Sequence, residues 1–357
     1  MDDINCGVPD QHVARELLRA LEFVLNSLGV RLNSAKTKIL GAREALRYFW
    51  VHENRALTIL TNLAKTAIPQ SATWQAHLGK ARRLYRRFRK AERVGQWDKV
   101  AKRYFTLFGL FGHGELQRDV PTLLSDSPGL RGAIFRYYAL LGPSGGRLHH
   151  ISEFLRSGRC LDDASLFEAI RTLIAWRGQT TGRRRTEILA LVPIVKTLGS
   201  VTLDGGLSTS SGVSSGIWLL AKYGSPTELA SFLRTTRSVW TRSAWAARQA
   251  AAATPLLPIA DEQWVREAIV ESGLTEALRV LASIGQVAKM TTLDKQMRAY
   301  LLHQPSPGHS YPLEKAIIGR IALRSRISKQ DRSTLRQALS VTTSDPCYRL
   351  ILSRRRA

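Results

Sequence analysis

The apolar positions near the start of the chain recur with helical spacing. Between residues 13 and 28 they fall three or four positions apart, at Val13, Leu17, Leu18, Leu21, Val24, Leu25 and Leu28. This spacing predicts an amphipathic helix. Asp10 stands where a helix N-cap is favoured, and Gly29 stands where a C-cap is favoured. Beyond Gly29, residues 30–33 and 38–40 are predicted to be short extended segments, so the first forty residues are expected to form a small α+β unit.

Further along the chain the pattern becomes almost entirely helical. The aromatic run at residues 48–51 is expected to be either a last strand or a hinge. Residues 52–70 then show helical spacing with Pro69 as the stop. From about residue 121 the sequence predicts short helices separated by Gly, Pro and Ser, with flexible loops at residues 144–146 and 204–212.

The last third of the chain predicts paired helices of similar length. Ser225 and Glu228 form a candidate capping box, with a proline between them at the first helical position of a helix that ends near residue 236. Further helices are predicted at residues 238–253, 261–272, 274–285, 291–303, 313–325 and 328–341. Paired helices joined by short turns favour an α-solenoid of the HEAT-like kind, and a compact helical bundle is the alternative. Five tryptophans within predicted helices are expected to pack in the core: Trp176, Trp218, Trp240, Trp245 and Trp264.

Charge adds a candidate partner to this picture. The chain of 357 residues has 53 Lys+Arg against 28 Asp+Glu, for a formal charge of +25. Its hydrophobic content of 44% is that of a globular protein. A strongly basic surface gains affinity for nucleic acid by releasing counterions, so RNA or DNA is the expected partner.

The basic residues are densest in one predicted helix. Its charged positions are Lys80, Arg82, Arg83, Arg86, Arg87, Arg89 and Lys90, with Arg93 just beyond them. Four of these positions (Arg82, Arg86, Arg89 and Arg93) are predicted to share one helix face, opposite Leu84, Tyr85 and Phe88. A row of like charges destabilises an isolated helix, so an anionic partner would relieve it. The alternative is a basic face that only contacts solvent.

Other features of the sequence limit the class of protein. No run approaches the roughly eighteen apolar residues of a membrane span, so no transmembrane helix and no membrane partner are expected. The three cysteines, Cys6, Cys160 and Cys347, are far apart, which favours a reducing, cytoplasmic location over a disulfide framework or a zinc site.

The first forty residues resemble the end of a reverse transcriptase palm domain. In that family an aromatic-x-Asp-Asp sequence on a β-hairpin carries metal-binding carboxylates, and a helix and a Leu-Gly-Leu-x-Leu-Asn-x-x-Lys-Thr segment follow. Here Met1-Asp2-Asp3 matches the first motif, and residues 28–37 match the second. The resemblance implies that Asp2 is a ligand of catalytic Mg²⁺, that Asp3 is its weaker partner, and that Lys36 lies near the incoming deoxynucleotide.

The same resemblance implies an organisation and a limit on activity. Residues 1–50 would be a palm remnant, residues 51–120 a basic thumb-like region that holds template and primer, and residues 121–357 a helical-repeat region. One Asp pair cannot hold two cations about 4 Å apart, and the second metal-binding Asp of the family lies upstream. We therefore expect this chain to be the C-terminal part of a longer polymerase, and to be inactive alone.

Three functional hypotheses follow. The first is the C-terminal part of an RNA-directed DNA polymerase of the abortive-infection type, because bacterial defence-associated members of that family join a palm to HEAT-like helices that help to assemble oligomers. The second is a non-catalytic helical-repeat protein that binds nucleic acid. The third is a scaffold for protein interactions.

Overall fold

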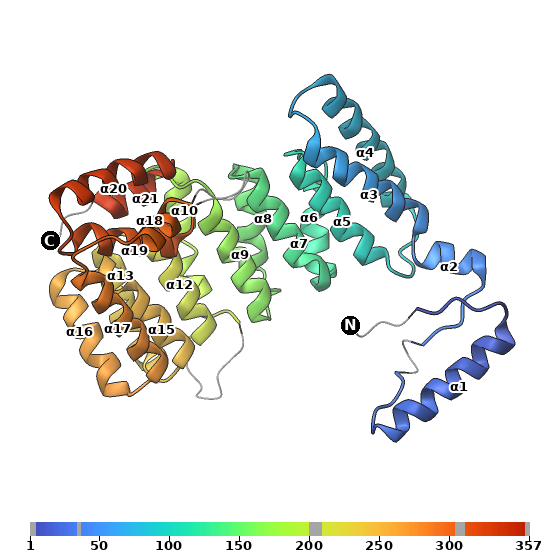
Figure 1. The fold of residues 1–357 in the computed structure, drawn as a ribbon, viewed down its shortest axis with the longest axis horizontal. Coiled ribbons are helices and arrows are strands. Elements are labelled where there is room, and N and C mark those ends of the chain that lie inside the picture. Colours follow the sequence, from blue (N-terminus) through green and yellow to red (C-terminus); the bar gives the residue numbers. More distant parts are fainter. Residues whose placement is uncertain (1–4, 34–36, 200–208, 304–310, 354–357) are drawn as a thin grey trace.

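The computed structural model describes residues 5–33, 37–199, 209–303 and 311–353. Within these ranges the chain forms α-helices and short 3₁₀ helices and contains no strand, so the prediction of a mostly helical fold is confirmed. Figure 1 shows the helices following one another along the long axis of the molecule, with α1 at one end and the C-terminal helices at the other. One hydrophobic core runs from Trp50 to Ile351.

The predicted first helix is present, but the strands expected after it are not. Helix α1 (Gln11–Ser27) begins at Asp10, whose carboxylate accepts a hydrogen bond from the backbone N–H of Val13 at 2.9 Å. Gly29 follows the helix with a φ of 71°, a left-handed conformation that favours glycine. Residues 30–33 and 37–40 are irregular, and the described ranges contain no strand that could pair with them. The expectation of an α+β unit is therefore wrong for the described residues.

The aromatic run at residues 48–51 contains the connection between two helices and is not a strand. Helix α2 (Ala42–Tyr48) ends there, and α3 (Val51–Thr66) begins after Trp50, which has a left-handed φ of 51°. The Trp50 indole is buried and donates a hydrogen bond to the carbonyl of Val94 at 2.9 Å. This contact holds the connection between α2 and α3 against the segment that follows α4.

Helices α3, α4 (Ala72–Lys90) and α5 (Trp97–Leu110) pack together as an antiparallel group (Figure 1). The predicted helix at residues 52–70 ends earlier than expected, at Thr66. Leu57 and Leu60 of α3 are fully buried, and the Phe88 ring of α4 stacks on Trp97 of α5 with ring centroids 5.4 Å apart.

The remaining helices form a continuous array. In its first half, the 3₁₀ helices η1 (Gln117–Asp119) and η2 (Pro128–Leu130) accompany α6 (Val120–Asp126), α7 (Arg131–Leu141), α8 (Gly145–Arg156), α9 (Asp163–Ala175), α10 (Arg183–Leu189), α11 (Val192–Val195) and α12 (Ser210–Tyr223). The second half contains α13 (Pro226–Thr235), α14 (Arg237–Trp240), α15 (Ala244–Ala253), η3 (Thr254–Leu256), α16 (Ile259–Ser272), α17 (Thr275–Lys289), α18 (Lys295–Leu302), α19 (Leu313–Arg324), α20 (Lys329–Thr342) and α21 (Pro346–Ser353). One row of helices packs each against the next through the array, in the order α3, α5, α7, α9, α12, α15, α17, α19 and α21.

Several local predictions can be compared with these helices. The capping box of Ser225 and Glu228 is confirmed at the start of α13. The single helix expected at residues 238–253 is divided into α14 and α15, because Ser243 caps a new helix there. The loop expected at residues 144–146 is instead the start of α8, and residues 210–212 belong to α12. Helix α21 was not predicted.

The tryptophans divide into three groups. Trp176 and Trp240 are fully buried, as expected. Trp218 and Trp264 are only partly buried at the edge of the core. The prediction is wrong for Trp245, whose side chain is 45% exposed.

A buried ion pair connects the middle of the array to its C-terminal end. The ammonium of Lys222, on α12, lies 2.7 Å from a carboxylate oxygen of Asp345, just before α21. The same ammonium donates to the carbonyls of Ile174 and Trp176, each at 2.6 Å. Burial lowers the pKa of Lys222, and the negative charge of Asp345 opposes that shift. Asp345 also accepts a hydrogen bond from the backbone N–H of Gly178 at 3.0 Å, so every group in this cluster is satisfied.

No helix in the described part of the chain combines the length and the apolar character that crossing a membrane requires.

Candidate nucleic-acid interface

Helix α4 carries the densest group of basic side chains, and its apolar residues fix its orientation. Ser71 caps its start by accepting a hydrogen bond from the backbone N–H of Trp74 at 3.2 Å. The buried stripe of the helix consists of Leu78, Ala81, Tyr85 and Phe88. The basic residues occupy the rest of the helix surface, where they form two rows.

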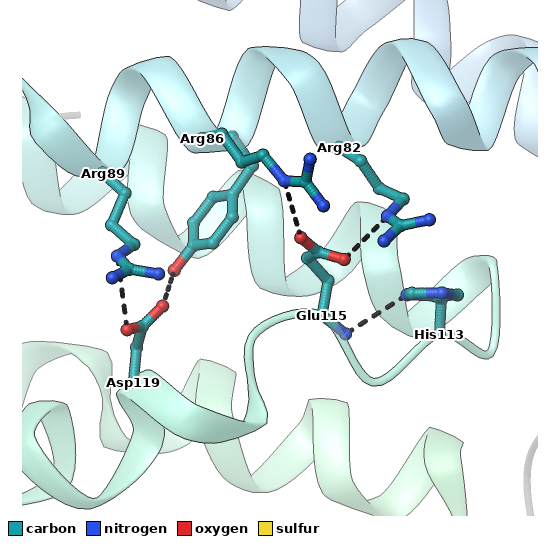
Figure 2. Close-up of polar contacts among 7 residues, drawn as sticks. Arg82, Arg86, Arg89, His113, Glu115 and Asp119 are labelled. Atoms are coloured by element: carbon teal, nitrogen blue, oxygen red, sulfur yellow. Dashed lines mark hydrogen bonds and ion pairs between the residues drawn. The ribbon is translucent and has the colours of Figure 1, made fainter.

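The first row consists of Arg82, Arg86 and Arg89, and it is paired within the protein. Figure 2 shows these side chains directed at two carboxylates in the segment that follows α5. Glu115 accepts hydrogen bonds from Arg82 Nε at 2.7 Å and from Arg86 Nε at 3.3 Å. Arg89 lies 3.5 Å from Asp119. We call these three arginines the paired row.

The surroundings of Glu115, which accepts hydrogen bonds from the paired row, keep its carboxylate charged. The Glu115 side chain is only 9% exposed. Its burial favours the neutral acid, but the hydrogen bonds and positive charges of Arg82 and Arg86 outweigh burial and lower its pKa. The backbone N–H of Glu115 donates to His113 Nδ1 at 3.2 Å, and burial together with the charge of Arg82 lowers the pKa of that imidazole.

Tyr85 completes the contact between α4 and the segment after α5. Its hydroxyl donates to a carboxylate oxygen of Asp119 at 2.8 Å. Burial of the ring, followed by this hydrogen bond, raises the pKa of Tyr85, so it remains a neutral donor. The paired row therefore fixes α4 in place.

The second row consists of Lys80, Arg83, Arg87 and Lys90, which we call the outer row. All four side chains are exposed. At 100° per residue they fall within an arc of about 80°, on the side of the helix away from its buried stripe. From Lys80 to Lys90 the row is about 15 Å long at 1.5 Å per residue. No carboxylate in the described ranges forms an ion pair with it.

Arg93 belongs to neither row. Its guanidinium lies over the ring of Trp97, 4.6 Å from the ring centroid. Both side chains line a cavity of about 190 Å³ between α4, α5 and α6, together with Arg89 and Asp119. The single face predicted for Arg82, Arg86, Arg89 and Arg93 is therefore divided between internal ion pairs and an aromatic contact.

The residues predicted to form the polymerase centre are outside the described part of the chain. Asp2, Asp3 and Lys36 all fall in ranges that the structure does not describe. Next to Lys36, the backbone N–H and the hydroxyl of Thr37 both donate to the carbonyl of Asn33, each at 2.9 Å. Among the described residues, no three His, Cys, Asp or Glu side chains form a group that could hold a metal ion.

Sequence reasoning missed the carboxylates that neutralise the paired row. Glu115 and Asp119 are four residues apart in the segment that follows α5. Because α5 runs antiparallel to α4, that segment returns along α4 (Figure 2). The sequence did contain a signal for this pairing. Two acidic residues follow a helical hairpin whose first helix is basic.

Comparisons of the chain with protein-family models, curated proteins and solved structures give no match. A functional assignment therefore depends on the site itself. An exposed row of Lys and Arg on a fixed helix is suited to phosphate oxygens, which carry charge but no base sequence.

Proposed function

We propose that this chain is the C-terminal part of a defence-associated RNA-directed DNA polymerase, and that the outer row of α4 holds RNA or DNA through its phosphate backbone. The observation that carries the proposal is the contrast between the two rows of one helix. Arg82, Arg86 and Arg89 have carboxylate partners, whereas the four basic residues of the outer row have none among the residues that the structure describes. Like charges at this spacing repel one another, and a phosphate backbone would remove that repulsion.

The paired row supports this role by its rigidity. Its ion pairs and the Tyr85 hydrogen bond hold α4 against η1, so the outer row is presented on a fixed support. A pre-organised surface loses less conformational entropy on binding than a mobile one. Contacts of this kind position a duplex without reading its bases, as template and primer require.

The uncovered face of α1 favours a larger assembly. Leu17, Phe23, Val24 and Leu28 are 41%, 77%, 52% and 71% exposed. A helix with such a face normally packs against another element. In the proposed polymerase, that element is part of the palm, where Asp2 and a further Asp would bind Mg²⁺, with Asp3 in support and Lys36 near the deoxynucleotide.

The succession of helices from α7 to α21 supports the repeat region of the proposal. Each helix of the row packs on the next, as in an α-solenoid of HEAT-like type. We propose that this array, in residues 121–357, assembles copies of the polymerase.

The binding part of the proposal is tested by salt-dependent affinity. The combined variant Lys80→Gln, Arg83→Gln, Arg87→Gln and Lys90→Gln is titrated with a labelled primer–template duplex over a range of salt concentrations. Each lost phosphate contact reduces the slope of log K against log salt by about 0.9, so four contacts predict a reduction of about 3 to 4. The matched control removes four exposed basic residues of the array: Arg242, Arg248, Arg326 and Lys329.

A second variant tests the contrast between the two rows by freeing arginines of the paired row. Glu115→Gln removes the negative charge that holds Arg82 and Arg86, so duplex affinity should rise and the salt slope should become steeper. If the control variant loses as much affinity as the outer-row variant, binding depends only on net charge and the assignment to α4 is wrong.

The polymerase part of the proposal needs a separate test, because a non-catalytic nucleic-acid-binding protein would give the same titrations. The DNA immediately upstream of the Met1 codon should encode, in frame, an aromatic residue and an earlier metal-binding Asp motif. This chain alone should incorporate no nucleotide with Mg²⁺. Incorporation that disappears in Asp2→Ala would show that its metal site is complete without upstream residues.

A further inference from the structure

A second concentration of arginines surrounds a cavity at the opposite end of the molecule from α4. The cavity has a volume of about 490 Å³ and lies among α16, α17, α19, α20 and α21, which cluster at the C-terminal end of the array (Figure 1). This volume falls in the range of small-molecule sites, roughly 300–1,000 Å³. Its guanidinium groups come from three different helices: Arg266, Arg324, Arg332 and Arg336.

Positive charge predominates in the lining. Among the described residues that line the cavity, Glu262 is the only one with a carboxylate, and it accepts hydrogen bonds from Arg266 Nε at 3.1 Å and Nη2 at 2.9 Å. Arg332 is held by backbone carbonyls, since its Nη2 donates to Ser325 at 2.9 Å and to Ile327 at 3.2 Å.

One donor of a residue that lines this cavity is buried and unsatisfied. Arg332 Nε is shielded from solvent and has no hydrogen-bond partner in the described ranges. A buried donor without a partner is costly, and an acceptor in the cavity would remove that cost once the Arg332 side chain turns its Nε toward the cavity. Arg336 is exposed at the cavity, and no carboxylate of the described chain pairs with it.

Apart from Ser353, the rest of the lining is apolar. Pro255, Ile321 and Leu323 are buried, and Ile284 and Leu352 are partly buried beside them. A ligand that fits this lining carries an anionic group for the arginines and an apolar or planar body for the other side. An arginine with a free guanidinium edge, such as Arg336, matches phosphate oxygens with two parallel hydrogen bonds, and Arg332 can add a single one from Nε.

We propose that this cavity binds a small organic phosphate, with Arg332 and Arg336 on the phosphate and the apolar side chains against its planar body. The site is separate from the outer row of α4, so it does not depend on the nucleic-acid role. It would give the helical array a ligand of its own.

The experiment is calorimetric titration of the full chain at low salt with adenosine monophosphate, inorganic pyrophosphate and adenosine. The monophosphate should bind most tightly, pyrophosphate more weakly, and adenosine without measurable affinity. Arg336→Ala should weaken binding of the monophosphate by about 10-fold or more, the effect of losing a charge-assisted hydrogen bond. Arg242→Ala, which removes an exposed arginine away from the cavity, should leave it unchanged.

A charge-neutral variant separates the cavity from general electrostatics. Ala288 is an exposed lining residue, so Ala288→Phe should fill the cavity without disturbing the core and should abolish binding of the monophosphate. Thermal unfolding of each variant verifies that it remains folded. The proposal is overturned if the monophosphate does not bind or if adenosine binds equally well. It is also overturned if the affinity for the monophosphate is unchanged in both Arg336→Ala and Ala288→Phe.

Discussion

Helices α1 and α12 show how differently the apolar residues of two helices are used in one chain. Helix α1 has the clearer amphipathic pattern in the sequence, yet Ala14 is its only buried residue. Helix α12 is rich in Ser and Gly, yet all its residues except Ser210 and Trp218 are buried. An apolar pattern therefore predicts a helix and its apolar face, but not whether another part of the chain covers that face.

Small residues explain why α12 is so well covered. A Cβ atom added at Gly212 would lie 2.4 Å from the carbonyl oxygen of Val195, and one at Gly216 would lie 2.4 Å from the ring of Phe232. The neighbouring elements thus approach the backbone of α12 closely. The burial that follows leaves Lys222 in the protein interior, where it needs the carboxylate of Asp345.

The largest loss of stability should come from breaking the ion pair between Lys222 and Asp345. Lys222→Ala leaves the buried carboxylate of Asp345 without its counter-charge, and we expect the free energy of unfolding to fall by about 3–5 kcal/mol. Urea denaturation followed by circular dichroism measures this change. Lys329→Ala, at an exposed position of α20, is the control and should have little effect. A loss below about 1 kcal/mol in Lys222→Ala would mean that solvent reaches this site.

A smaller loss of stability should come from replacing a closely packed glycine of α12. Gly212→Ala directs a methyl group at the backbone carbonyls of Val195 and Lys196, which cannot move aside as a side chain can. We expect a loss of about 1–3 kcal/mol from overpacking. The matched control is Gly285→Ala in α17, where the added Cβ meets nothing within 4 Å. That change should instead stabilise the protein by about 0.5–1 kcal/mol, as Ala replaces Gly within a helix. Equal effects at both positions would contradict the close packing of α12.

Local signals in the sequence predicted local structure well. Asp10 and Ser225 cap helices as expected, because a cap needs only the backbone N–H groups two or three residues ahead. Features that depend on residues far away in the sequence were predicted less well. The strands expected near residues 30–40 need neighbours that the described chain does not supply, and an exposed side chain of Trp245 cannot be recognised from its helical position.

The candidate interface shows the same limit. The sequence correctly placed a strongly basic helix at residues 80–90, since charge density is visible without a fold. It assigned the nucleic-acid contacts to Arg82, Arg86 and Arg89 together with the rest of the helix. Only the position of Glu115 and Asp119 in space separates the paired row from the outer row, and that position depends on how α5 packs against α4.

The smallest effect should come from α1. The double variant Leu17→Ser and Phe23→Ser removes two exposed apolar side chains, and we expect the free energy of unfolding of the array to change by less than about 0.5 kcal/mol, as for surface positions in general. Ile217→Ala in α12 provides the contrast, with an expected loss of about 2–5 kcal/mol because its side chain is buried. Denaturation curves of both variants, measured at the same protein concentration, make the comparison. A loss above about 1 kcal/mol in the α1 variant would show that this face is already covered in the isolated chain. That result would contradict the proposal that another part of a polymerase packs on α1.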